Sequence, residues 1–374
     1  MSSKRVGRLV VITRLAGSGE NKRVNTRRLT VDPGHLETAE ANEALNRAAE
    51  ILRGGGLVAL PTETVYGLGA NALDEDAIRR IFRAKRRPAW DPVIVHVGEE
   101  SMLDGLVKEI PERARRLIQE FWPGPLTLLL PRTAAVPDVV TAGRPQVGVR
   151  MPAHPVALEL IRRAGVPIAA PSANLFGHIS PTTAAHVLDD LDGRIEAVLD
   201  AGATEHGVES TVIDPCRSPM VIYRPGAVTA EQIRAVAGPV ECFQEVEKPV
   251  KRPKGGLPSP GVGLRHYAPK ARLVLLEAPL AGLSTRLAEA AQDWSGERLG
   301  IMLPTGVAVP GELRDAHVYA WGHWDSPKEL ARRLYMGLRA LDAESCSVIV
   351  CPLPPAEGIG AAIHDRLRKA AKEK

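Results

Sequence analysis

The stretch DEDAIRRIFRAKRRPAWDPVIVHV, residues 74–97, predicts the unit from which the fold is built, a helix followed by a strand. Residues 74–84 carry apolar side chains at helical spacing, and Asp74 stands where a side chain can cap the first backbone N–H groups. Residues 93–97, VIVHV, form a short apolar run that is typical of a buried strand. A helix and a buried strand in close succession indicate an α/β protein.

Three consecutive cations, Lys85, Arg86 and Arg87, end the predicted helix just before Pro88. Cations in a last helical turn interact favourably with the free carbonyl groups, and proline is an ordinary stop signal. A solvated charge run is therefore the preferred interpretation of this segment taken alone. The alternative is that the cations bind an anionic ligand.

The same alternation continues from residue 38 to 238. An alanine-rich helix at 39–53 ends at glycines, and the apolar run LVAL follows at 57–60. Further strands are predicted at 126–130, 147–150, 167–170, 197–200, 210–214 and 221–224. Further helices are predicted at 111–121, 154–164 and 181–191, the last capped by Ser180. So many short strands predict a domain with a large, twisted, mixed sheet.

Interruptions of this pattern divide the rest of the chain, whose 374 residues exceed one ordinary core. Residues 1–37 are predicted to be a basic, partly disordered extension, because the first 28 hold eight Lys or Arg against one acid. Residues 239–270, rich in proline, glycine and charge, are predicted to be a linker. Residues 271–374 are predicted to form a smaller, Rossmann-like, doubly wound α/β domain. Its strands are expected at 272–277, 299–303, 317–321 and 347–351, and its helices at 283–294, 327–341 and 360–371.

The composition is that of a globular protein that stays out of membranes. Apolar residues make up 44% and charged residues 25%, and no apolar run approaches the ~18 residues that cross a bilayer. A net charge of +4 is too small to argue for nucleic acid. The four cysteines form no CxxC pair, which suggests a reducing compartment, so we expect a cytoplasmic location.

Common nucleotide and hydrolase motifs do not explain the chain. Gly67, Gly69 and Ala72 match G-x-G-x-x-A, but PTETV separates them from the preceding strand, and the next helix begins only at Asp74. A dinucleotide site is therefore disfavoured, since its glycines should lie in the turn that opens a helix. No GxxxxGK[ST], HExxH or GxSxG sequence occurs.

Polar clusters instead follow the predicted strands, where α/β folds place their ligand sites. Each cluster alone fits a turn or a cap. Arg150 and Arg224 end apolar strands, where a buried cation requires a partner. Together with Lys85 and Arg87, the clusters supply cations and hydroxyls suited to a phosphate chain. The clusters are PTET (61–64), PSAN (171–174) and VESTV (208–212).

Eight ordered motifs carry a resemblance to a known family. They are PTETVYGLGANAL, KRRPAWDPVIVH, FWPGPLTLLL, VRMPAHPVALELI, PIAAPSANLFGHISPT, VESTVID, YRPGAVT and SPGVGLRHYAPKARL. In this order they resemble the threonylcarbamoyl-AMP synthase family, the YrdC-like enzymes, in its long two-domain form. The match runs from about residue 38 to 230, resumes at 259, and reaches GIGAAIHDRLRKAA at 358–371. The first domain is accordingly expected to be a YrdC-like catalytic domain.

The resemblance implies a nucleotidyltransferase that combines L-threonine, bicarbonate or CO₂, and ATP into threonylcarbamoyl-AMP and pyrophosphate. Mg²⁺ is expected with ATP, bound through phosphate and water rather than by a protein cage. Other proteins would then transfer the threonylcarbamoyl group to an adenosine beside the anticodon of certain tRNAs. The enzyme itself would hold two anions in line and neutralise phosphate charge.

The resemblance also implies roles for individual residues. Lys85 and Arg87 would be the catalytic cations that contact the phosphates. The expected ATP-binding residues are Lys85, Arg87, Asp91, Ser172, Asn174, Ser180 and Arg224. The expected L-threonine-binding residues are Thr64, His96, Arg150 and Ser210. The segment SPGVGLRHYAPK is expected to cover the mouth of the site as a lid, through Arg265, His266 and Tyr267.

Two positions depart from the family pattern. Asp91 replaces the usual asparagine, and a carboxylate would repel triphosphate unless it faces Mg²⁺ or pairs with a neighbouring cation. Leu264 replaces the usual tyrosine before RHYAP, which puts stacking from the linker on the nucleotide in doubt.

Two other functions stay open at this point. One is a module that binds double-stranded RNA or tRNA, since YrdC-like folds can present a basic concave face and the N-terminal arm is cationic. The aromatic content of 4% offers no stacking pattern for it, so we expect at most a weak RNA contact. The other is a YrdC-like domain that handles carbamoyl phosphate, against which the threonine-side residues and the second domain argue.

Overall fold

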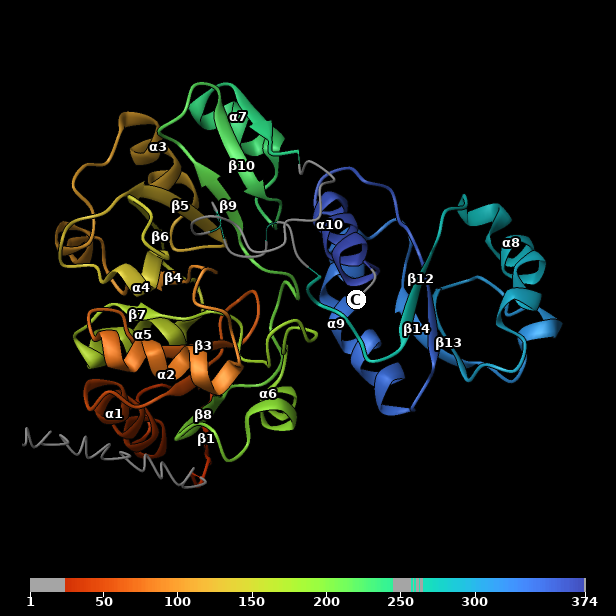
Figure 1. Cartoon of the computed structure of the whole chain (residues 1–374), viewed down its shortest axis with the longest axis horizontal. Helices are drawn as coiled ribbons and strands as arrows, with labels where there is room; N and C mark the ends of the chain where they lie inside the picture. The colour runs from red at the N-terminus through yellow and green to blue at the C-terminus, as the bar shows by residue number, and fades with distance from the viewer. Residues whose placement is uncertain (1–23, 245–256, 258, 260–261, 263–264, 373–374) are drawn as a thin grey trace, which may run out of the picture.

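The computed structural model describes residues 24–244, 257, 259, 262 and 265–372. They fold around two separate sheets, one of eleven strands and one of four. Figure 1 shows the two units side by side, with two helices of the second unit packed toward the first. The predicted α/β class is confirmed.

The first sheet is mixed, as the sequence predicts. Its order is β1-β8-β2-β3-β7-β4-β6-β5-β9-β10-β11. Parallel pairs, such as β4 with β6, stand beside antiparallel pairs, such as β5 with β6. The strands are β1 Arg27–Thr30, β2 Val58–Leu60, β3 Gly67–Asn71, β4 Ile94–His96, β5 Leu126–Pro131, β6 Gln146–Arg150, β7 Ile168–Ala169, β8 Ala197–Asp200, β9 Thr211–Asp214, β10 Met220–Arg224 and β11 Val240–Cys242.

Helices bury one face each against this sheet. Apolar side chains of α2, such as Ile78 and Ile81, pack in one core with Val95 of β4 and Val149 of β6. Most predicted helices lie within a few residues of their observed bounds. The helices are α1 Ala39–Arg53, α2 Glu75–Lys85, α3 Glu112–Phe121, α4 Asp138–Thr141, α5 Pro155–Ala164, α6 Ala184–Leu191 and α7 Ala230–Ala237, with a 3₁₀ helix at Glu100–Gly105.

The opening stretch forms the predicted helix and strand. Asp74 caps α2, because its carboxylate accepts from the backbone N–H groups of Asp76 and Ala77. The helix ends at Arg86, which takes a left-handed conformation with φ 54°. This reversal separates the neighbouring cations, so that Lys85 is buried while Arg86 is exposed.

Three predictions about element boundaries are wrong. Residues 27–30 of the predicted basic extension form β1, an edge strand parallel to β8, in which Arg28 pairs with Asp200. Leu29 is the one apolar residue of this edge strand and is only partly buried, so composition hides the strand. Residues 240–242 of the predicted linker form β11 at the opposite edge. The helix expected from 181 starts at 184, because Thr183 rather than Ser180 accepts from its first turn.

The glycines of the G-x-G-x-x-A sequence lie within β3 rather than in a phosphate-binding turn. A Cβ atom on Gly69 would stand 2.8 Å from Cδ2 of Leu60 and 3.0 Å from Cγ2 of Ile168. A Cβ atom on Gly67 would stand 3.1 Å from Cβ of Ala170. These glycines therefore allow neighbouring strands and loops to approach closely in the middle of the sheet.

The second unit is a parallel sheet with helices on both faces, which confirms the Rossmann-like prediction. Its strand order is β12-β15-β13-β14. Helices α9 and α10 cover the face toward the first unit, and α8 lies on the other side (Figure 1). The elements are β12 Arg272–Leu276, α8 Leu283–Glu289, β13 Leu299–Pro304, β14 His317–Gly322, α9 Pro327–Ala343, β15 Val348–Pro352 and α10 Gly360–Ala370, with 3₁₀ helices at Leu280–Gly282, Ala291–Trp294 and Gly311–Leu313. Across the described part of the chain, no helix is long and apolar enough to cross a membrane.

Candidate active site

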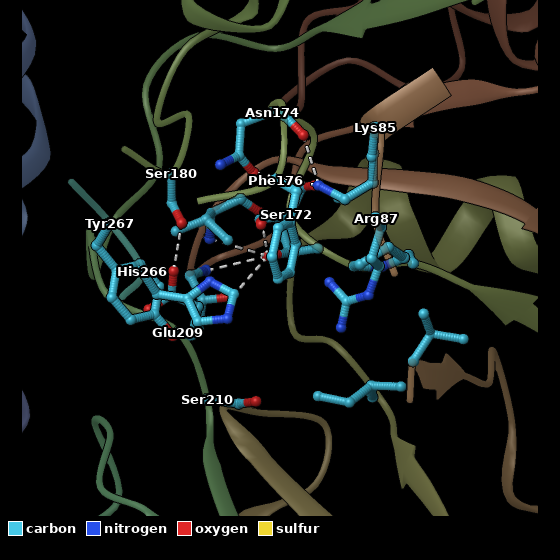
Figure 2. Close-up of a pocket in the computed structure, with 18 of the residues that line it drawn as sticks. Lys85, Arg87, Ser172, Asn174, Phe176, Ser180, Glu209, Ser210, His266 and Tyr267 are labelled. Carbon is cyan, nitrogen blue, oxygen red and sulfur yellow. Dashed lines mark hydrogen bonds between the residues drawn. The ribbon is translucent and has the colours of Figure 1, made fainter. Parts of the chain in front are cut away.

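Most of the predicted site residues line one pocket in the first unit, beside the second unit (Figure 2). The structure brings together Thr64, Lys85, Arg87, His96, Arg150, Ser172, Asn174, Ser180, Ser210, Arg224, His266 and Tyr267. These residues form two groups according to the elements that carry them. The strand wall consists of His96, Arg150, Ser210 and Arg224, at or next to strand ends. The loop wall consists of Lys85, Arg87, Ser172, Asn174 and Ser180, from the end of α2 and the segment after β7.

Lys85 joins the two distant motifs of the loop wall. Its ammonium group donates to the backbone oxygens of Ser172 at 2.5 Å and Asn174 at 2.6 Å, with the Asn174 side-chain oxygen at 3.4 Å (Figure 2). Burial lowers the pKa of Lys85 well below its ordinary value, and the nearby charge of Arg87 adds to this. Lys85 is therefore a buried clamp that shapes the loop as well as a source of charge in the pocket.

Arg87 lines the pocket and forms an ion pair with Asp91, which lies outside the pocket. Its guanidinium donates to the backbone oxygen of Pro92 at 2.7 Å and pairs with Asp91 Oδ2 at 3.0 Å. The ring of Phe176 lies 6.0 Å from the guanidinium carbon. Burial raises the pKa of Asp91, although Arg87 and Lys85 oppose that shift.

Asp91 is placed differently from its expected role as an ATP contact. It is fully buried and is not among the residues that line the pocket. The pairing with a neighbouring cation resolves the charge conflict raised by the sequence, because the carboxylate faces Arg87 rather than the open space. The structure thus makes Asp91 a support for Arg87.

The strand wall is organised around Arg150. The register of β4 and β6 places His96 directly beside Arg150. The guanidinium donates to the Thr64 hydroxyl at 3.1 Å and to the backbone oxygen of Gly124 at 3.1 Å, and it pairs with Glu63 Oε1 at 2.6 Å. These contacts fix Arg150 in a buried position where it lines the pocket.

His96 is a neutral imidazole in this setting. Burial lowers its pKa to about 3, and the charge of Arg150 contributes. Its Nδ1 atom has no hydrogen-bond partner among the described residues. A buried ring nitrogen without a partner is suited to accept or donate a bond to a bound ligand.

Arg224 and Ser210 connect the strand wall internally. Arg224 donates to the Ser210 hydroxyl at 3.1 Å and to its backbone oxygen at 3.0 Å. The Ser210 hydroxyl is also 2.8 Å from that of Thr127. Ser210 is thus held in one orientation at the floor of the pocket.

Glu209 is a pocket residue that the sequence reasoning missed. It accepts from the Ser180 hydroxyl at 2.5 Å and from two residues of the second unit, Arg366 at 2.7 Å and Tyr335 at 3.0 Å. Burial alone would raise the pKa of Glu209, but Arg366, Arg224 and the hydrogen bonds lower it to about 2. Its position beside Ser210 in VESTV could have indicated that it lies in the pocket. The sequence did not show which partner would neutralise its charge.

The lid residues divide between two positions. His266 and Tyr267 line the pocket, and the His266 ring meets the Phe176 ring edge-on at 4.8 Å. Arg265 instead lines a neighbouring cavity between the units. Leu264 lies outside the described residues. Phe176 was not predicted, although it lies two residues after PSAN and its ring contacts both His266 and Arg87.

Comparison with known proteins decides the family. A family model described as "Telomere recombination", of the Sua5, YciO and YrdC group, matches residues 50–226, and "Threonylcarbamoyl-AMP synthase, C-terminal domain" matches residues 228–372. Threonylcarbamoyl-AMP synthase of Pyrococcus abyssi is 45% identical over 87% of this chain and 93% of that protein. The chain belongs to the threonylcarbamoyl-AMP synthase family. The Bacillus subtilis member is 43% identical over 90% of this chain and 95% of its own.

Solved structures of the same family share the two-unit arrangement. The crystal structure of P. abyssi Sua5 complexed with L-threonine has a TM-score of 0.80 at 40% identity, covering 93% of this chain and 97% of that one. A second P. abyssi Sua5 structure has a TM-score of 0.81. The threonylcarbamoyl-AMP synthase fold therefore extends through both units of this chain.

Proposed function

We propose that this protein is an L-threonylcarbamoyladenylate synthase, a nucleotidyltransferase that makes threonylcarbamoyl-AMP and pyrophosphate. The observation that carries the proposal is one pocket with two cationic walls, in a chain whose relatives bear this enzyme name. A relative's structure is described as complexed with L-threonine. Two sets of cations in one pocket suit two anionic substrates held against each other.

The reaction proposed here uses no covalent bond to the protein. The threonine amine takes up CO₂ to form a carbamate, or bicarbonate with loss of water. A carbamate oxygen then forms a bond to the α-phosphorus of ATP, and the bond from that phosphorus to the bridging oxygen breaks. Pyrophosphate leaves with that oxygen. The protein's contribution is to hold the reactants in line and to stabilise charge on the departing group.

We assign the loop wall and Arg224 to the triphosphate. Lys85 and Arg87 would face the phosphates, and Ser172, Asn174 and Ser180 would hold the nucleotide. In support, both cations line the pocket and are buried, where charge is screened least. The support from Asp91 keeps the guanidinium of Arg87 oriented before any ligand arrives.

We assign His96, Arg150 and Ser210 of the strand wall, together with Thr64, to L-threonine. The carboxylate would lie against the pocket edge of Arg150, beside the Thr64 hydroxyl that already accepts from it. The neutral His96 would bond to the threonine hydroxyl or amine, which gives its unpartnered Nδ1 a use. A neutral ring adds no charge that would compete with Arg150.

Mg²⁺ would arrive with ATP rather than reside in the protein. Within residues 24–244, 257, 259, 262 and 265–372 no cluster of three or more His, Cys, Asp or Glu could hold a metal ion. The carboxylate of Glu209 is already occupied by Arg366 and Tyr335. The carboxylates and other donor side chains therefore do not fit a metal site formed by the protein alone.

The product points to partners outside this chain. A mixed anhydride of a carbamate and AMP is an activated group donor, and we propose that transfer proteins acting on tRNA in the cytoplasm consume it. Direct RNA binding receives less support, because the cations of the pocket are buried and paired rather than displayed on a surface.

The test is a pyrophosphate-release assay with ATP, in which L-threonine and bicarbonate are each omitted in turn. We expect release only when both are present, with threonylcarbamoyl-AMP identified by mass spectrometry. L-Valine, which matches the size of threonine but lacks its hydroxyl, should support much less release. Equal release with and without threonine would contradict the proposal.

A further inference from the structure

Glu209 brings a negative charge into a pocket that otherwise offers cations and hydroxyls. Among the described residues that line the pocket it is the sole carboxylate. Figure 2 shows Ser180 pointing at it, with the lid residues His266 and Tyr267 alongside. An uncompensated carboxylate beside the pocket cations would repel a triphosphate. The site therefore requires that the charge of Glu209 be cancelled.

Arg224 of the first unit contributes to this compensation, but the direct ion pair comes from the second unit. Arg366 of α10 has a side chain that is 1% exposed, and its Nε donates to Glu209 Oε2 at 2.7 Å. Tyr335 of α9 donates to the same carboxylate at 3.0 Å. Neither residue lines the pocket, so both act on it through Glu209.

The same residues also hold the lid. The guanidinium carbon of Arg366 lies 5.3 Å from the centre of the Tyr267 ring. Tyr267 stacks on Tyr335 with ring centres 5.9 Å apart. Tyr335 of α9 and Arg366 of α10 thus contact both Glu209 and Tyr267. Both contacts require the second unit to be docked on the first.

We propose that Arg366 is a positioning residue that makes the pocket competent for a nucleoside triphosphate by neutralising Glu209 across the boundary between the two units. The second unit then supplies a counter-charge: the guanidinium of Arg366 offsets the carboxylate of Glu209, so that the pocket presents its cations to the nucleotide. This rests on the proposed function for the identity of the anion. The inference goes beyond the proposed function because it assigns the control of nucleotide binding to Arg366 and Glu209.

The experiment compares Arg366→Gln with the double variant Arg366→Gln/Glu209→Gln in the full chain. Binding of the non-reacting analogue α,β-methylene-ATP is measured by titration calorimetry, and KM is measured for ATP and for L-threonine. Arg366→Gln should weaken analogue binding and raise KM for ATP by about tenfold or more, because a buried charge loses its partner. KM for threonine should change less than threefold or so. Removing the carboxylate as well should restore most of the analogue affinity.

A matched control separates charge from docking. Arg339 of α9 also bridges the units, since it donates to the backbone oxygen of Ile179 at 2.6 Å and to Asp190 at 3.0 Å, but it does not touch Glu209. Arg339→Gln removes contacts between the units but leaves the pair of Arg366 and Glu209 in place, so analogue affinity should stay within about twofold of the wild type while small-angle scattering shows the units docked. Arg366→Lys, which keeps the charge, should stay within about fivefold of the wild type for ATP.

Several results would overturn the inference. Unchanged analogue affinity in Arg366→Gln would show that the charge of Glu209 does not reach the nucleotide. A loss that Glu209→Gln fails to restore would make Arg366 a docking residue only. If Arg366→Gln does not fold, Tyr335→Phe decides: it removes one donor to Glu209, and analogue affinity equal to the wild type would contradict the inference. A wild-type chain that binds the analogue but makes no threonylcarbamoyl-AMP would refute the proposed function while leaving this inference standing.

Discussion

The two walls of the pocket are built in different ways. Residues of the strand wall come from neighbouring strands, and pairing alone places His96 of β4 beside Arg150 of β6. The loop wall depends on contacts between segments far apart in sequence, such as Lys85 with Ser172 and Asn174. It also depends on the lid and the second unit. The strand wall is thus part of the sheet itself, whereas the loop wall is assembled from separate segments of the chain.

The largest effect on the difference between the two walls is expected from removing Lys85, the buried clamp of the loop wall. Lys85→Ala should lower kcat/KM for ATP by about 100-fold or more, because it removes charge at the phosphates and releases the loop of Ser172 and Asn174. Arg86→Asn is the matched control, since asparagine tolerates the left-handed conformation at that position. The control should keep near-normal activity. Near-normal activity of Lys85→Ala, with circular dichroism unchanged, would contradict the assignment of the loop wall.

Removing the centre of the strand wall should act on the other substrate. Arg150→Gln is expected to raise KM for L-threonine by about 10- to 100-fold while KM for ATP changes little. It should also cost about 3–5 kcal/mol in the free energy of unfolding in urea, because Glu63 is left buried without its partner. Glu63→Gln in the same chain should recover stability but not threonine affinity. An effect on KM for ATP alone would show that the two walls are assigned the wrong way round.

The lid should contribute less than either wall. His266→Ala removes the ring that rests on Phe176, so we expect a rise of about five- to tenfold in KM for ATP and little change for threonine. Phe176→Leu should produce a change of similar size, because it removes the other ring of the same contact. If His266→Ala affected threonine as strongly as ATP, the lid would belong to both walls equally.

The strand wall also predicts a pH dependence of stability, which comes from His96. The folded protein keeps this histidine neutral, with a pKa of about 3, whereas the unfolded chain takes up a proton near the ordinary value of 6.5. Stability is therefore lost as pH falls through 6.5 toward 3. His266, whose pKa burial also lowers to about 3, adds a contribution in the same direction.

Replacing His96 removes its share of this dependence. Between pH 7.5 and pH 5 the share amounts to about 2 kcal/mol in the free energy of unfolding. In His96→Gln, urea unfolding should therefore differ less between the two pH values than in the wild type, by about that amount. An identical difference in both proteins would mean that His96 is protonated in the folded state.

The sequence predicted the strand wall and the repeating elements well, because both depend on local patterns. Strand ends are marked by apolar runs, and the family motifs place Arg150 and His96 on them. The edge strand β1 was missed, since Leu29 is its one apolar residue and gives no apolar alternation. Thr183 took the cap expected of Ser180, because Ser180 is engaged by Glu209.

The missed residues share one physical reason. Glu209 and Phe176 gain their roles from partners more than 80 residues away in sequence, Arg366 and His266 respectively. Asp91 was expected to face the nucleotide, but its side chain points toward Arg87. The spacing of residues in the sequence does not specify this direction. Long-range pairing of charges is decided in the folded state, so local pattern cannot supply it.

The central claim is that one pocket joins L-threonine, CO₂ or bicarbonate, and ATP. The most direct measurement supplies ¹³C-bicarbonate, L-threonine and ATP, and follows both pyrophosphate and the mass of the adenylate formed. The account predicts one pyrophosphate for each threonylcarbamoyl-AMP, with the label in its carbamoyl carbon. Pyrophosphate release without a labelled adenylate, or an adenylate formed without threonine, would contradict it.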